Sequence, residues 1–149
     1  MAMNIPISTL MNPQSAKLCT VTPKATVMHA VIKMNEQRVG SVLVMDGDQL
    51  VGIFTERDVL RRVVGVGLDP KTTPVTNVMT GLVMTISPDA TLQQLMELFS
   101  EKRMRHMPVV RDGKVIGMVS ISDVSRWVAS ASQAEAESLR QYIAGSLTS

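Results

Sequence analysis

Apolar residues recur at positions i, i+3, i+4 and i+7 in two segments of the chain, which is the spacing of one face of an amphipathic helix. The two sets are Val27, Ala30, Val31 and Met34, and Leu92, Leu95, Met96 and Phe99. Thr26 and Thr91 precede these sets as N-caps, and Gln94 completes a capping box in the second. The pattern predicts one helix from Thr26 to about Arg38 and another that begins at Thr91.

Short runs of apolar and β-branched residues indicate strands on either side of these helices. The predicted strands are residues 20–21, 41–45, 50–55, 107–110 and 115–120. Turn residues Asp46-Gly47-Asp48 and Asp112-Gly113 separate the paired strands. Further helices are expected at residues 56–64 and from Ile121 to about Ala129. The second repeat is expected to restate the first, including its short first strand, so each half of the chain reads β-α-β-β-α.

The two halves are copies of one another. Residues 20–59 align with residues 85–124 without a gap, and ten of the forty positions are identical. One unit of about 60 residues has a thin core, so two units are expected to pack together. The predicted fold is α+β, of the α/β type: two β-α-β-β-α repeats related by a pseudo-twofold axis and packed through their sheets, plus an extra C-terminal helix.

The duplication sets the expected boundaries. The first repeat spans residues 8–66, a linker 67–75, the second repeat 76–130, and a C-terminal helix and tail 131–149. Short helical turns are expected at the start of each repeat.

The C-terminal segment has no counterpart in the first half. Ser132 and Glu135 form a capping box at its start, and Gly145 is expected to end its helix. Leu139, Tyr142 and Ile143 make a narrow apolar stripe that could extend a dimer interface or dock on the protein's own surface.

Composition narrows the classes of function. The net charge of +2 does not indicate nucleic-acid binding, and no apolar run reaches the ~20 residues that span a bilayer. A single cysteine, Cys19, suits a reducing compartment, and two separate histidines, His29 and His106, argue against a zinc site. We expect a soluble, cytoplasmic protein without a membrane or nucleic-acid partner.

The repeated motif has two interpretations. It reads Gly52-Ile53-Phe54-Thr55-Glu56-Arg57-Asp58 in the first half and Gly117-Met118-Val119-Ser120-Ile121-Ser122-Asp123 in the second. A hydroxyl followed three residues later by an acid is a helix capping box, which implies no ligand. The same strand-to-helix junction also presents free N–H groups to a phosphate, and an ionised aspartate accepts hydrogen bonds from a ribose diol. Two copies therefore indicate either two caps or two nucleotide sites.

These motifs resemble a tandem pair of cystathionine β-synthase (CBS) domains, also called a Bateman module. The resemblance rests on the duplicated motif, on the Thr-x-x-Pro-x-Ala-Thr segment before the first helix of each repeat, and on Met107-Pro108-Val109-Val110. It covers the chain from about Ser8 to Trp127 and implies a stand-alone CBS-pair protein. It also implies a cleft that binds an adenosine derivative (AMP, ADP, ATP, NAD or S-adenosylmethionine) and a homodimer.

The resemblance carries ligand contacts over to matching positions. Asp58 and Asp123 would hold ribose hydroxyls, and Thr55 and Ser120 would contact phosphate or ribose. The expected adenine-pocket residues are Thr20, Val21, Thr85 and Ile86. The expected pocket floor consists of Gly40, Ser41, Val42, Arg105, His106, Met107 and Pro108.

The two sites are expected to be unequal. Arg105 and His106 could meet a phosphate chain, and Arg57 could add a contact that neutral Ser122 cannot make. The first repeat has Leu43 where the second has Pro108. Exposed charge is the default for an arginine, so a solvated surface pair is the alternative for Arg105 and His106. Arg61 and Arg62 are expected to face solvent.

The leading hypothesis is a non-catalytic regulatory module that senses an adenosine ligand, for example as a signal of energy status, and passes a conformational change to an unknown protein target. No catalytic cofactor or metal is expected. A nucleotide-independent adaptor or dimerisation protein is the first alternative. A nucleotide-processing enzyme ranks second, since the sequence shows no activated nucleophile.

Overall fold

The first repeat contains a three-stranded sheet and the helices that cover it. The computed structural model describes residues 3–11, 17–81 and 83–148. The elements of the first repeat are β1 (Thr20–Val21), α1 (Val27–Gln37), β2 (Ser41–Asp46), β3 (Gln49–Thr55), α2 (Glu56–Asp58) and η2 (Val59–Val64). The sheet order is β1-β2-β3, with β1 parallel and β3 antiparallel to β2. These strands and α1 confirm the sequence pattern.

The helix predicted at residues 56–64 changes its winding. After the single α-helical turn of α2, η2 is a π-helix. The Gly65 N–H donates to the Leu60 carbonyl five residues back, at 2.8 Å, and a Cβ on Gly65 would lie only 2.8 Å from the same oxygen. Because glycine has no Cβ, residue 65 can come close enough to the Leu60 carbonyl to make the hydrogen bond of the wider π-helical turn.

The second repeat keeps the plan with a smaller sheet. Its elements are η3 (Val75–Asn77) before it, then α3 (Leu92–Lys102), β4 (His106–Arg111), β5 (Lys114–Ser120) and α4 (Ile121–Thr148). The third strand that we expected here is reduced to one parallel bridge between Ile86 and Val109. In the first repeat, the Leu43 N–H donates to the Cys19 carbonyl at 2.9 Å. Pro108 holds the matching position and has no N–H, so this ladder is shorter.

Each repeat is completed by a segment that precedes the other one. Ile7 in η1 (Ile7–Thr9) is fully buried in the apolar cluster of the second repeat, and its N–H donates to the Ala90 carbonyl at 2.8 Å. Val75 is fully buried in the cluster of the first repeat, and its N–H donates to the Ala25 carbonyl at 2.8 Å. The chain therefore crosses between its halves twice, which ties them together.

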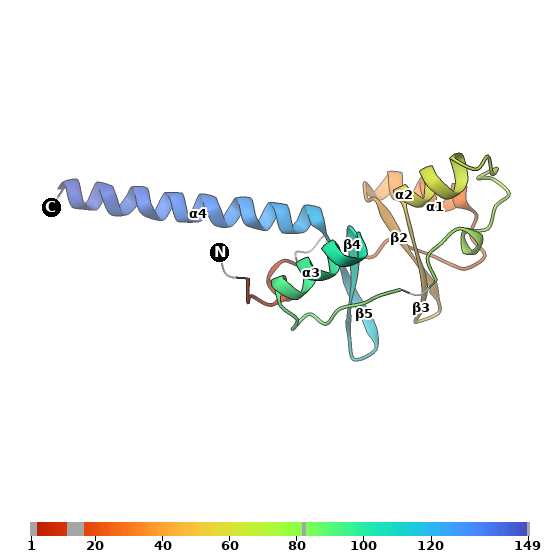
Figure 1. Cartoon of the computed structure of the whole chain (residues 1–149), viewed down its shortest axis with the longest axis horizontal. Helices are drawn as coiled ribbons and strands as arrows, with labels where there is room; N and C mark the ends of the chain where they lie inside the picture. The colour runs from red at the N-terminus through yellow and green to blue at the C-terminus, as the bar shows by residue number, and fades with distance from the viewer. Residues whose placement is uncertain (1–2, 12–16, 82, 149) are drawn as a thin grey trace.

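The C-terminal helix is longer and simpler than predicted. One continuous helix, α4, replaces the two that we expected to be divided near Ala129, and it runs through Gly145. The intervening residues are alanine, serine, glutamine and glutamate, and none of them breaks a helix, so Ser132 has no helix start to cap. Figure 1 shows α4 leaving the second repeat and extending away from the body, so the backbone of its C-terminal part does not dock on the protein's own surface. The side chains of Leu139, Tyr142 and Ile143 lie outside the described residues.

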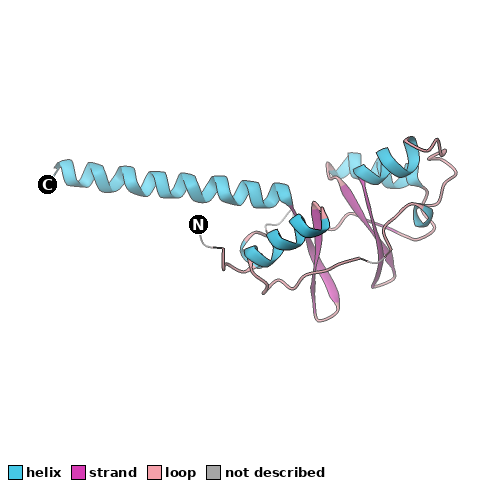
Figure 2. Cartoon of the chain, viewed as in Figure 1, coloured by secondary structure: helices cyan, strands magenta, loops and turns pink. Residues whose placement is uncertain are grey.

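Together these elements form the α+β, two-repeat architecture that the sequence predicts. Figure 2 shows the two strand pairs side by side, each accompanied by helices of its own half. Within the described residues, no helix combines the length and apolarity that crossing a membrane requires.

Candidate functional site

A cleft of about 960 Å³ opens between the two repeats. One wall comes from α1, β3, α2 and η2 of the first repeat, and the second from residues 102–106 at the end of α3 and the start of β4. Thr80, Val83 and Met84, between η3 and α3, complete the lining. A volume of this size is typical of small-molecule sites.

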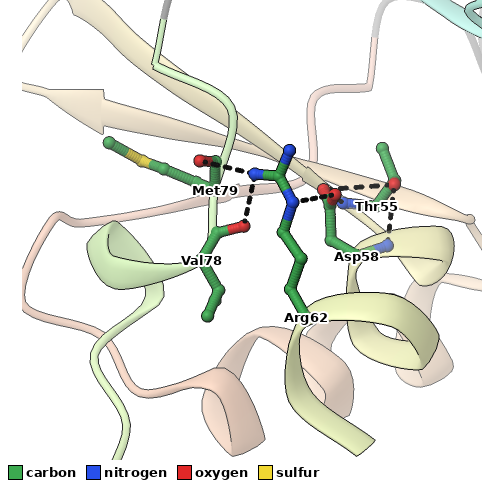
Figure 3. Close-up of polar contacts among 5 residues, drawn as sticks. All are labelled: Thr55, Asp58, Arg62, Val78 and Met79. Atoms are coloured by element: carbon green, nitrogen blue, oxygen red, sulfur yellow. Dashed lines mark hydrogen bonds and ion pairs between the residues drawn. The ribbon is translucent and has the colours of Figure 1, made fainter. Parts of the chain in front are cut away.

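The first copy of the motif enters this cleft as a helix cap. The Thr55 N–H and hydroxyl both donate to Asp58 Oδ2, at 3.0 and 3.2 Å, and the Asp58 N–H donates back to Thr55 Oγ1 at 3.4 Å. Figure 3 shows this reciprocal box together with Arg62, whose Nε lies 3.7 Å from Asp58 Oδ1. The capping interpretation of the motif is thus realised in full.

Arg62 also fastens the segment that follows η3 to the first repeat. Its Nη1 donates to the carbonyl oxygens of Val78 and Met79, at 3.2 and 3.3 Å (Figure 3). We expected this side chain to face solvent, and it is 51% exposed, but two carbonyls and a carboxylate also hold its guanidinium. Asp58 keeps only 13% of its side chain exposed.

The second copy of the motif is built in the same way. The Ser120 N–H donates to Asp123 Oδ2 at 2.7 Å, the Ser120 hydroxyl donates to the same oxygen at 3.1 Å, and Arg126 pairs with Asp123 Oδ1. Position 127, which matches Arg62, is a tryptophan packed against the apolar cluster of the second repeat. Its indole cannot repeat the guanidinium's link to a carboxylate.

His106 lies where the two repeats meet. A Cβ on Gly40 would be 3.2 Å from Glu56 Oε1 and 3.5 Å from His106 Nε2, so both side chains lie beside Gly40, just before β2. Burial lowers the pKa of His106 from its ordinary 6.5, Glu56 and Asp123 oppose this change, and Arg105 and Arg57 add to it. A neutral imidazole therefore faces charges from both repeats.

Five of the predicted ligand residues line this cleft. They are Thr55, Arg57, Asp58, Arg105 and His106. The Arg57 guanidinium also reaches across the cleft and donates to the Arg103 carbonyl at 3.4 Å.

The remaining predicted residues lie elsewhere. Thr85 lines a second, shallower hollow of about 580 Å³ between the repeats, near the strand turns. Val42 and Met107 are fully buried in the two apolar clusters. The Thr20 carbonyl accepts a hydrogen bond from Lys33 Nζ. Among the predicted residues outside this cleft, the other well-buried ones are Val21, Ser41, Ile86 and Pro108.

Sequence reasoning missed most of the positive charge in the cleft. Its lining includes Arg61, Arg62, Lys102 and Arg103, and also Glu56, none of which we predicted as ligand residues. The run Lys102-Arg103-Met104-Arg105 could have drawn attention to this wall, but only the fold brings it opposite η2. Within the described residues, no group of three or more metal-ligating side chains is present.

The comparisons with known proteins agree with this geometry. A family model described as "CBS domain" matches residues 7–65 and again residues 75–130. The mitochondrial CBS domain-containing protein CBSX3 of Arabidopsis thaliana is 40% identical over 129 residues, which cover 83% of this chain and 63% of that protein. The chain thus spans less than two thirds of this relative.

Solved structures share the fold. The crystal structure of the CBS domain NE2398 is 34% identical, with a TM-score of 0.79, and the match covers 84% of this chain and 98% of that one. A CBS domain protein from Pyrobaculum aerophilum, solved in complex with AMP, is 24% identical with a TM-score of 0.72, over 80% of this chain and 89% of that one. At that identity the likeness concerns the fold alone.

Proposed function

The chain belongs to the CBS-domain family, and from that premise we propose that it is a non-catalytic regulatory module that binds an adenosine-containing ligand in the cleft between its repeats. The observation that carries this proposal is the positive charge of the cleft, to which both repeats contribute arginines. An anionic ligand seated there would contact both halves at once. A protein of the same fold, from Pyrobaculum aerophilum, was solved in complex with AMP, so adenosine nucleotides are the ligands to test first.

Ligand binding would regulate by favouring one arrangement of the two repeats. Arg57 and His106 touch or face the opposite repeat, so a phosphate between them changes the interactions that join the halves. A ligand shifts an equilibrium only by the difference in its affinity for the two states. An unidentified protein target that recognises one arrangement would then receive the signal.

A thermal-shift screen followed by calorimetry tests the proposal. The ligands are AMP, ADP, ATP, NAD, NADH and S-adenosylmethionine. At 100 times its dissociation constant a ligand adds about 2.7 kcal/mol to the free energy of unfolding, which is visible as a higher Tm. A selective shift is expected. No shift with any of these ligands, from protein free of co-purified nucleotide, would favour the adaptor function, in which the repeated motif only caps helices.

The same samples test the enzyme alternative. Incubating the protein with ATP or NAD and separating the products by chromatography is expected to return the unchanged nucleotide. Steady turnover that a variant of the cleft abolishes would instead make the protein an enzyme.

We also propose that the protein forms a homodimer through η2. Leu60, Val64 and Val66 are 66%, 66% and 64% exposed in the first repeat. The positions that match Leu60 and Val64 in the second repeat are Ser125 and Ala129, so this apolar surface belongs to one half only. Light scattering should report a dimer that Val64→Asp dissociates and Ala129→Asp does not. A monomeric parent protein would contradict this assembly.

A further inference from the structure

We infer that the inter-repeat cleft is the single anion site of each chain and that it selects nucleotides by the number of their phosphates, so that a nucleoside triphosphate binds more tightly than a monophosphate. This inference rests on the proposed function and deepens it. Two observations carry it: the excess charge of the cleft and the loss of that charge at the positions that match it by the pseudo-twofold repeat.

The net positive charge of the residues that line the cleft exceeds the net charge of the whole protein. Its cationic lining residues are Arg57, Arg61, Arg62, Lys102, Arg103 and Arg105. Only two acids, Glu56 and Asp58, oppose these six cations, which leaves a formal excess of four charges, against a net charge of +2 for the whole chain. A monophosphate would leave most of this charge unmatched, whereas a triphosphate chain would neutralise it.

The motif itself has little capacity left for a ligand. Asp58 Oδ2 accepts two hydrogen bonds from Thr55, and Oδ1 faces Arg62. The Thr55 hydroxyl donates its proton to Asp58 and accepts from the Asp58 N–H. Recognition at this cleft therefore falls chiefly on the cations rather than on the ribose contacts.

The counterpart of the cleft lacks these cations. The residues at the positions matching the six cations are, in order, Ser122, Arg126, Trp127, Gln37, Arg38 and Gly40. Only two of them, Arg126 and Arg38, are charged. The duplication has thus kept the capping boxes in both halves but concentrated the phosphate-binding charge in one cleft.

Titration calorimetry with adenosine, AMP, ADP and ATP, free of divalent cations, tests the inference. We expect one ATP per chain, an affinity that rises with each added phosphate, and a weakening of ATP binding as salt is raised, because screening acts on the charged contacts. Inorganic triphosphate is expected to compete with ATP, whereas adenosine is not.

Arg103 and Arg38 provide a matched pair of variants. Both end a helix in the left-handed conformation, with φ of 53° and 56°, so the backbone consequences of substitution are the same. Arg103→Gln should weaken ATP binding by about tenfold and AMP binding by less, since it removes one charge-assisted contact. Arg38→Gln should leave both affinities unchanged.

The outcomes separate the two proposals. No binding of any nucleotide would overturn the proposed function itself. Tight binding of AMP or adenosine with no gain for ATP would leave the proposed function standing and overturn the phosphate selection. Two ATP molecules per chain, or equal losses from Arg103→Gln and Arg38→Gln, would show that the counterpart site is also used and overturn the single site.

Discussion

Asp58 and Asp123 stand at matching positions, and each carboxylate accepts from the backbone N–H and the hydroxyl of the residue that starts its helix. A sequence motif cannot say whether such an acid serves a cap or a ligand, because both uses need an acceptor three residues after a hydroxyl. In the structure both carboxylates make the capping hydrogen bonds. Arg62 and Arg126, at different spacings from the aspartates, then hold the remaining oxygens.

Removing either aspartate should therefore cost stability. Asp58→Ala and Asp123→Ala are each expected to lower the free energy of unfolding by about 1–2 kcal/mol, because an N–H at the helix start loses its acceptor. Urea denaturation measures the change. Asp89→Ala is the control: its carboxylate is 82% exposed and pairs with Arg111, so a change below about 0.5 kcal/mol is expected. Equal losses in all three variants would contradict the structural role of the caps.

His106 should make stability depend on pH. Its pKa in the folded chain lies below the ordinary 6.5, chiefly through burial, so the unfolded chain takes up the proton at a higher pH. Its contribution to stability is complete above pH 6.5 and is lost as the pH falls from 6.5 towards the folded pKa. Urea midpoints measured at pH 7.5 and 5.5 should therefore differ less in His106→Gln than in the parent protein. His29→Gln, on the exposed side of α1, should keep the parent difference.

At the scale of elements, periodicity predicted α1 and α3 well because both are amphipathic helices with one apolar face on a core. Periodicity failed where the end of a helix or strand depends on a single backbone contact. Gly65 allows η2 to close as a π-helix, and Pro108 shortens the ladder beside Ile86. The capping box at Ser132 predicted a helix start that does not exist. Ser132 lies inside the unbroken helix α4, where a cap sequence has no helix start to stabilise.

The glycine that opens the repeated motif has a packing role that can be tested. A Cβ on Gly52 would clash with Met79 Sδ and lie 3.0 Å from its Cγ, so the Met79 side chain packs on β3 in the space that a side chain at position 52 would need. Gly52→Ala is expected to lower the free energy of unfolding by about 1–3 kcal/mol. Urea denaturation of Gly52→Ala, Met79→Ala and the double variant should show that Met79→Ala recovers much of this loss. Strictly additive losses would mean that the two residues do not compete for space.

At the scale of the molecule, the duplication predicted two packed repeats, and the boundaries expected from it followed the order of the chain. The packing does not follow that order: η1 lies on the second repeat and η3 on the first. Apolar patterning cannot reveal this exchange, because Ile7 and Val75 would be equally buried on either half. The cleft was foreseen through the resemblance, whereas its charge depends on which walls the fold brings face to face.

The crossed packing predicts which half of the molecule a substitution loosens. Ile7→Ala, in the segment before the first repeat, should destabilise the second repeat by about 2–5 kcal/mol, whereas Val75→Ala, before the second repeat, should destabilise the first by about 1–3 kcal/mol. Both side chains are fully buried, so each substitution leaves a cavity in one cluster only. Hydrogen exchange resolved by peptide reports local opening. In Ile7→Ala, amides of α3 and β4 should exchange faster than those of α1 and β2, and in Val75→Ala the order should reverse. Faster exchange in the repeat adjacent in sequence would contradict the crossing, because loosening would then follow the order of the chain rather than its contacts.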